Sequence, residues 1–399
     1  MSHIVFAWEL GADLGHLSGF LPLALRLRER GHRITFISRD LANVGELLVG
    51  KGFAVLQAPV WLAKSAGLPK PPLNYAEIVM HCGYHSAQAL LGLASAWRGL
   101  YDMLRPDLVV CDHAPTALLA ARGAGVRRAV YGLGFFSPPH TAPLPVMRPW
   151  HKPPAGRIER NERRVLDAVN AVLTAQGGTA LARLADLFHV DEDFLCTFRE
   201  FDHYPQRGDG AHYWGPVYNV EHGTDVAWRE PAARHIFAYV KPQSRDFDKV
   251  ALALRRLDAE TLLFAPGLGL RRAQELATDR MRVSLVPLRL AGILKRCDLA
   301  VCHAGLGTMA AVMQHAVPVL ALPMQLEQYL IGRCLETLGA GVSIKPEDAP
   351  PDYAKLLNDL LDNPAYGNAA RGFAQAHADH DPDRQFTAMA DRIEKIVAG

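Results

Sequence analysis

The segment from His303 to Thr308 combines residue types that can bind a phosphate group. It reads His-Ala-Gly-Leu-Gly-Thr and follows Leu299–Cys302, an apolar run that predicts a buried strand. Residues from Met309 onward have a helical pattern. The segment is therefore predicted to be a strand-to-helix turn.

Each polar or flexible residue of this turn has a possible use. Gly305 and Gly307 would let the backbone approach a ligand closely. The helix amino terminus offers N–H groups and a partial positive charge, which suit a diphosphate. Thr308 is expected to cap the helix, and His303 is expected to donate an N–H to a phosphate oxygen. A plain tight turn explains the same spacing.

The surrounding elements predict two α/β domains. His3–Trp8, Phe20–Arg30 and Arg33–Ser38 read as strand, helix and strand, a unit that builds parallel sheets. A second strand series begins at His235, after a polar stretch that resembles a domain boundary. We therefore expect two doubly wound domains with a cleft between them, and ligands at the carboxyl ends of their strands.

Composition narrows the class of protein. The chain has 399 residues, a net charge of +2 and six scattered cysteines, which indicate buried thiols in a reducing compartment. This charge gives no reason to expect nucleic acid as a partner. Neither a signal peptide nor an uncharged run of some 18 apolar residues is found, so a cytoplasmic protein without a transmembrane segment is expected.

The region downstream of the turn resembles the donor site of family 1 glycosyltransferases, which include plant and bacterial UDP-sugar transferases and antibiotic glycosyltransferases. Their pattern continues with a Gly-x-Pro element and a Pro-x-x-x-Asp/Glu-Gln element. Here Ala316–Pro318 and Pro323–Gln328 occupy these points, and Leu338–Gly341 matches the turn that follows. By this resemblance, Glu327 and Gln328 bind hydroxyl groups of the transferred sugar.

The resemblance implies the GT-B fold, with two Rossmann-like domains facing a cleft. The expected ranges are 1–218 for an acceptor-binding domain and 219–378 for a nucleotide-sugar-binding domain. Residues 379–399 are expected to form a helix that packs back on the first domain.

The resemblance also implies a general base. Family members carry it at a Gly-His in the loop between the first strand and the first helix, where this chain has Gly15-His16. Asp112 follows an apolar strand and matches the aspartate that orients the imidazole. His113 is expected to point the other way and to be incidental. The simpler interpretation of His16 is a residue at a helix amino terminus with no catalytic role.

The implied reaction is a single displacement with inversion that needs no metal and no cofactor; the nucleotide-diphosphate sugar is a co-substrate. His81 and His85, four residues apart on a predicted helix, formally fit a metal, but an acceptor-pocket or surface role is favoured. Phe135, Phe136 and Trp150 are further candidates for acceptor binding, and core packing also explains these aromatics.

Three departures from the family leave the donor nucleotide open between UDP and dTDP. Ala311 stands where many UDP-sugar transferases have a ribose-binding glutamate, which favours dTDP. Leu285 replaces a tryptophan that lies beside the donor's nucleobase in many relatives, and an aliphatic side chain packs on this ring with a smaller stacking contribution. Lys241 lies in a loop whose sequence differs from the family's usual one, and it either contacts the phosphates or is a solvated surface lysine.

Two other functions fit the same fold. A nucleotide-sugar 2-epimerase would need acidic residues around the donor, and Ala311 argues against it. A non-catalytic helper protein would not need both His16 and Asp112. The partners expected are a nucleotide sugar and a small-molecule acceptor, with the protein a monomer or homodimer.

Overall fold

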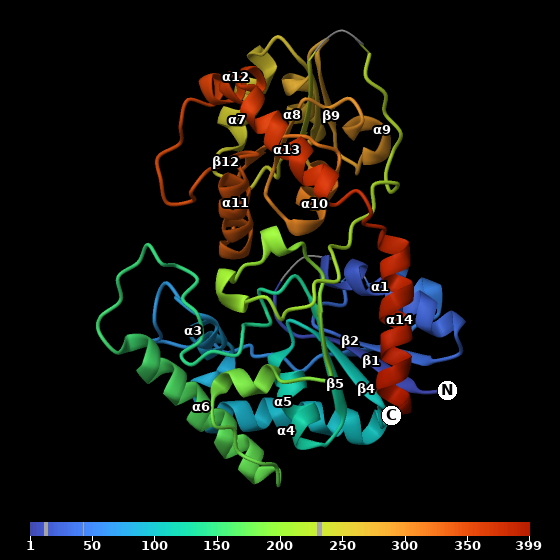
Figure 1. The fold of residues 1–399 in the computed structure, drawn as a ribbon, viewed down its shortest axis with the longest axis vertical. Helices are drawn as coiled ribbons and strands as arrows, with labels where there is room; N and C mark the ends of the chain where they lie inside the picture. The colour runs from blue at the N-terminus through green and yellow to red at the C-terminus, as the bar shows by residue number, and fades with distance from the viewer. Residues whose placement is uncertain (12–14, 43, 230–233) are drawn as a thin grey trace. The chain divides into compact units, whose positions relative to one another are not determined.

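The computed structural model describes residues 1–11, 15–42, 44–229 and 234–399. These residues form two compact units (Figure 1). Unit 1 comprises Met1–Thr197, Tyr204–Gly215 and Asp381–Gly399. Unit 2 comprises Phe198–His203 and Pro216–His380.

Unit 1 is built on a six-stranded parallel sheet in the order β3-β2-β1-β4-β5-β6. The strand order runs outward in opposite directions from β1 and from β4, so the loops after these two strands diverge at a topological switch point. In the register of β1 and β4, Trp8 pairs with Asp112. The strands are β1 (His3–Trp8), β2 (Arg33–Ser38), β3 (Ala54–Gln57), β4 (Leu108–Asp112), β5 (Arg127–Gly132) and β6 (Glu192–Leu195).

The helices of unit 1 form two groups: α1 contacts α14, and α4 contacts α5 and α6 (Figure 1). Ion pairs join the first group, with Arg26 bound to Asp383 at 2.6 Å and Arg30 to Asp391 at 2.7 Å. The helices are α1 (Gly15–Glu29), α2 (Val44–Leu47), α3 (Tyr75–Val79), α4 (Ala87–Leu104), α5 (Pro115–Gly123), α6 (Arg157–Ala175) and α14 (Pro382–Ala398).

The helix that the sequence predicts around His81 and His85 is interrupted. A π-helical turn, Met80–Tyr84, follows α3, and Gly83 within it has a φ of +96°, outside the helical region. The side chain of Ser86 then accepts a hydrogen bond from the Ala89 amide and begins α4 as a new helix. Because the apolar spacing continues through the break, the sequence pattern does not show it.

Unit 2 contains a second six-stranded parallel sheet, in the order β12-β11-β10-β7-β8-β9. Two central strands, β7 and β10, are paired, so the loops after them lie side by side at the carboxyl edge. The strands are β7 (His235–Tyr239), β8 (Glu260–Phe264), β9 (Met281–Ser284), β10 (Leu299–Cys302), β11 (Val319–Ala321) and β12 (Gly341–Ser343).

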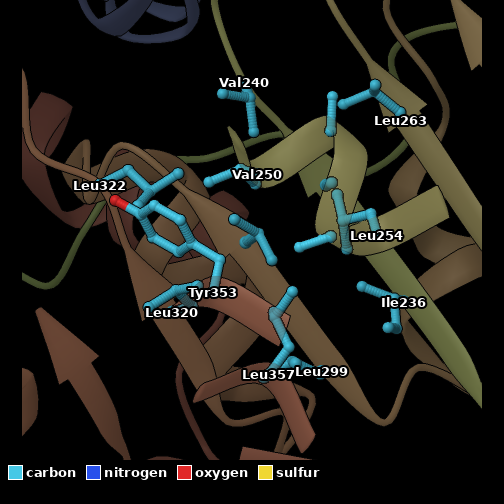
Figure 2. Packing of buried hydrophobic residues seen from close by; sticks show 14 of the residues in the cluster. Ile236, Val240, Val250, Leu254, Leu263, Leu299, Leu320, Leu322, Tyr353 and Leu357 are labelled. Atoms are coloured by element: carbon cyan, nitrogen blue, oxygen red, sulfur yellow. The ribbon is translucent and has the colours of Figure 1, made fainter. Parts of the chain in front are cut away.

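One core cluster of unit 2 lies between this sheet and helices α7 and α12 (Figure 2). Val250 and Leu254 from α7 meet Tyr353 and Leu357 from α12 on the apolar strands. Burying each large side chain stabilises the fold by about 1.5–3 kcal/mol. The helices are α7 (Phe247–Arg256), α8 (Leu270–Leu276), α9 (Leu290–Leu294), α10 (Leu306–Gln314), α11 (Leu326–Leu338), α12 (Tyr353–Asp362) and α13 (Pro364–Ala376).

None of the helices in the four described ranges is both long and apolar enough to cross a membrane.

Candidate active site

His16 and Asp112, which the sequence predicts as a pair, are in direct contact in unit 1. His16 lies in the first turn of α1, and Asp112 is the last residue of β4. The His16 Nδ1 atom lies 2.8 Å from Asp112 Oδ2, and the two side chains are only 12% and 6% exposed. A carboxylate accepts hydrogen bonds, so Nδ1 carries the proton and Nε2 is the atom that can accept one. This is the arrangement of an oriented general base.

Two glycines make room for the pair. A Cβ atom at Gly11 would lie 2.6 Å from His16 Nε2, and Gly11 has a φ of +90°. A Cβ atom at Gly132 would lie 3.1 Å from Asp112 Oδ1, with a φ of +141°. Side chains are strained at such φ values, and contacts below 3.0 Å force atoms to shift. Both positions therefore favour glycine, and the sequence patterns do not identify either as part of the site.

Aromatic rings enclose the imidazole of His16. Trp8, at the end of β1, stacks on it with ring centroids 5.1 Å apart and an interplanar angle of 21°. Phe136 lies on another side at 5.5 Å. These rings hold the imidazole in place, and they reduce the solvent around Nε2.

His113 was expected to point away from His16, and this prediction is wrong. Its ring centroid lies 6.3 Å from that of His16, and its ring stacks on Phe136 at 3.7 Å. The expectation assumed that side chains alternate along extended backbone. Strand β4 ends at Asp112, however, and His113 has a φ of +43°, so the alternation stops there.

The five predicted acceptor residues are not all brought together. Phe136 contacts His16, and Phe135 contacts Phe136 edge-on at 5.3 Å. The rings of His81 and His85 bond backbone carbonyls, those of Pro69 and Met80 respectively, and His85 also contacts Trp61. The ring of Trp150 lies beside His151. Phe136 is thus the predicted acceptor residue that the described contacts connect directly to His16.

The histidines at 81 and 85 are also not arranged as a metal site. The break at Gly83 removes the continuous helical face that their spacing assumed. Within the four described ranges, no group of three or more His, Cys, Asp or Glu side chains is arranged to hold a metal ion.

In unit 2 the turn after β10 leads into α10 as predicted, but a different residue begins the helix. Gly305 is the N-cap, with no side-chain hydrogen bond, and Thr308 lies inside the first turn. The Met309 amide donates to the Gly305 carbonyl at 3.0 Å. The amides that precede Met309 donate to no carbonyl of α10 and suit an anion. The expected capping by Thr308 was wrong because the helix begins at Leu306, two residues earlier.

His303 uses both ring nitrogens inside the protein. Its Nδ1 lies 2.7 Å from the Leu322 carbonyl and donates to it, and its Nε2 accepts from the Lys241 amide at 2.8 Å. Burial, and secondarily the charge of Lys241, lower the pKa of His303, which favours the neutral ring. In this arrangement the ring has no N–H left for a phosphate. Instead, His303 ties the loop after β7 to the turn after β10.

The remaining donor candidates lie at the carboxyl edge of the same sheet or next to it. Leu285 is half-buried directly after β9, and Lys241 follows β7. Glu327 and Gln328 lie in the first turn of α11. Gln328 Oε1 accepts the Met324 amide at 2.8 Å, which fixes its side chain.

His203 is a neighbour of Glu327 that the sequence patterns did not reveal. Its Nε2 lies 3.7 Å from Glu327 Oε1, and its side chain is fully buried. His203 belongs to the short segment Phe198–His203, which is part of unit 2. No motif in the sequence marks this residue as part of a site. At 3.7 Å, His203 Nε2 and Glu327 Oε1 are close but beyond the range of a direct hydrogen bond.

Comparisons with known proteins agree with the fold. Residues 249–391 match the model of the erythromycin biosynthesis protein CIII-like C-terminal domain. The chain is 36% identical to the elloramycin glycosyltransferase ElmGT of Streptomyces olivaceus, over 96% of this chain and 94% of that protein.

Solved structures show the same fold. The calicheamicin glycosyltransferase CalG4 superimposes with a TM-score of 0.73 at 16% identity, covering 100% of this chain and 98% of that one. The glycosyltransferase VinC, solved in complex with dTDP, has a TM-score of 0.62 at 16% identity, covering 100% of both chains.

The chain belongs to the family 1 glycosyltransferases with the GT-B fold. It is a glycosyltransferase of the antibiotic and natural-product type. The comparisons give the epimerase alternative no support, and relatives named as transferases favour an enzyme over a helper protein.

Proposed function

We propose that the enzyme transfers a sugar from a nucleotide-diphosphate sugar to a hydroxyl group of a small acceptor, with inversion at the anomeric carbon. His16 is the general base, and Asp112 is the residue that orients it. The observation that carries this proposal is the 2.8 Å contact between His16 Nδ1 and Asp112 Oδ2 in a nearly buried pair.

Each bond change has a group in the protein that assists it. The acceptor O–H bond breaks as its proton passes to His16 Nε2, and the acceptor oxygen forms a bond to the anomeric carbon. The bond from that carbon to the diphosphate oxygen breaks, and its electron pair leaves with the nucleoside diphosphate. Asp112 stabilises the imidazolium that forms, because its carboxylate accepts a hydrogen bond from the Nδ1–H group and carries the opposite charge.

Unit 2 recognises the donor in this proposal. The amides at the amino terminus of α10, with Gly305, Gly307 and Thr308 in its cap and first turn, stabilise the charge on the leaving diphosphate. Glu327 and Gln328 bind sugar hydroxyls; the Met324 amide holds the side chain of Gln328, and His203 lies beside that of Glu327. This charge stabilisation needs no metal ion and no further cofactor.

For the donor nucleotide we propose dTDP. Ala311 is buried in α10 and has no polar group for a ribose hydroxyl, and deoxyribose lacks the 2′-hydroxyl that a carboxylate would bind. The dTDP complex of VinC, a structural neighbour, supports the same choice. Leu285 packs on the pyrimidine ring, and Lys241 contributes positive charge near the diphosphate.

Calorimetric titration with dTDP and UDP tests the donor assignment, and product analysis tests the reaction. We expect dTDP to bind at least about fivefold more tightly than UDP, and UDP binding more tightly would reject this donor. Incubation with an α-linked dTDP-hexose and a phenolic acceptor should give a β-linked glycoside, identified by the coupling constant of its anomeric proton. A retained α linkage would exclude the single displacement.

A further inference from the structure

His113 is a buried imidazole next to the proposed general base. It follows Asp112 at the end of β4, and its carbonyl oxygen accepts the Leu10 amide at 2.9 Å. Its φ of +43° turns the ring toward the loop after β1. A histidine in the left-handed region is strained, so tertiary contacts must hold it there.

The ring of His113 is held by stacking on neighbouring aromatic rings. Phe136 stacks face to face on it at 3.7 Å and 12°, and Tyr75 lies at 6.0 Å. His113 is 8% exposed, and across the described ranges neither ring nitrogen has a hydrogen-bond partner. Burial lowers its pKa well below the usual value, so the ring is neutral, with one donor and one acceptor nitrogen. Buried polar atoms without partners are uncommon unless a ligand or water binds them.

His16 and His113 direct nitrogens to the same place. A Cβ atom at Gly11 would lie 2.6 Å from His16 Nε2 and 3.3 Å from His113 Nδ1. Both nitrogens therefore border the space that Gly11 leaves free by having no side chain. An acceptor hydroxyl that gives its proton to His16 Nε2 comes next to His113.

We propose that His113 binds the acceptor, through a hydrogen bond from its ring to a second oxygen next to the hydroxyl that is glycosylated. The proposal rests on His16 as the base. It implies a substrate class: acceptors whose reactive hydroxyl has a hydroxyl or carbonyl oxygen on the neighbouring carbon. Phe136 and Trp8, which cover the two histidines, favour a planar molecule.

Two coumarins test the proposal by binding alone. Esculetin has two neighbouring hydroxyl groups, and umbelliferone is the same ring system with one. We expect the native protein to bind esculetin about five- to tenfold more tightly in a fluorescence titration, which is the effect of one added hydrogen bond. Equal binding of the two, or binding of neither, would overturn the proposal.

Two variants assign the preference to His113. The variant His113→Phe keeps a ring for stacking on Phe136 but loses the nitrogens, and we expect it to bind both coumarins equally. The variant His113→Asn restores a hydrogen-bonding group and tolerates a positive φ, and it should recover part of the preference. A preference that persists in His113→Phe would refute the assignment. Unchanged dTDP affinity in both variants is the expected sign of intact folding, and lost affinity in both would reject a role confined to the acceptor.

A further variant distinguishes a failure of the proposed function from a failure of the His113 proposal. His16→Ala should keep the binding preference for esculetin and lose sugar transfer. If transfer persists in His16→Ala while His113→Phe abolishes it, His113 is the base, and both assignments are wrong.

Discussion

The replacement Asp112→Asn tests the role of the carboxylate beside His16. The structure places a unit negative charge 2.8 Å from the nitrogen that shares the positive charge once His16 is protonated. With an effective dielectric constant of about 20, the attraction at this separation is about 6 kcal/mol. If about half of the proton has been transferred in the transition state, the loss is about 3 kcal/mol, or roughly a hundredfold in kcat.

The assay is steady-state glycoside formation with saturating donor, followed by chromatography and mass spectrometry. The amide that replaces the carboxylate would still fit beside Gly132, so we expect the affinity for dTDP and the melting temperature to change little. Asp102→Asn is the matched control, since Asp102 is an exposed residue of α4 paired with Arg98. A decrease in kcat of less than about threefold for Asp112→Asn would refute the reasoning.

Three further changes have expected outcomes. Gly11→Ala places a Cβ atom 2.6 Å from His16 Nε2, so kcat should fall at least about tenfold. Gly99→Ala is the control, because it has open space around it and should leave kcat unchanged in the same assay. Equal activity of the two variants would contradict the geometry. Burial raises the pKa of Glu9 from 4.5 to about 7, so the folded protein holds a proton that the unfolded chain releases, and stability should fall as the pH rises through this window. Glu9→Gln should remove that loss and be more stable than the native protein by about 3 kcal/mol at pH 8 but not at pH 4. An equal effect at both pH values in denaturant titrations would count against it. Leu357→Ala should lower the free energy of unfolding of unit 2 by about 2–4 kcal/mol in denaturant titrations. Leu252→Ala, at a residue that is 45% exposed, should lower it by less than about 1 kcal/mol. Similar losses in the two variants would show that the core cluster is not where the structure puts it.

Much of the fold follows from patterns in the sequence. Apolar runs such as Leu108–Cys111 and Leu299–Cys302 are buried strands because parallel sheets are covered on both faces. Strand order and helix breaks depend on more distant contacts. The interruption at Gly83 is set by packing, since a Cβ atom there would lie 3.1 Å from Leu93 and 3.3 Å from Trp61.

The candidate site was predictable where chemistry depends on residue type at a strand end. His16 and Asp112 were expected together, and the structure places them in contact. Their catalytic role stays a prediction. The orientation of His113 was not predictable, because a positive φ at a histidine has no pattern in the neighbouring residues.

Hydrogen bonding was also beyond the sequence. The sequence predicts that the ring of His303 binds a phosphate oxygen. In the structure its two nitrogens instead form hydrogen bonds with the Leu322 carbonyl and the Lys241 amide of neighbouring loops. The contact of His203 with Glu327 joins residues that are far apart in the chain. Such pairs depend on tertiary structure, and a single sequence contains no direct record of it.

The rate of sugar transfer by His16→Ala under single-turnover conditions, with saturating dTDP-hexose, tests the central claim most directly. Without the imidazole, the acceptor hydroxyl has no base at the position that Asp112 supports, so the rate should fall at least about a thousandfold. The affinity for dTDP should stay within about twofold of the native value. A rate within tenfold of the native enzyme would contradict the assignment of His16 as the general base.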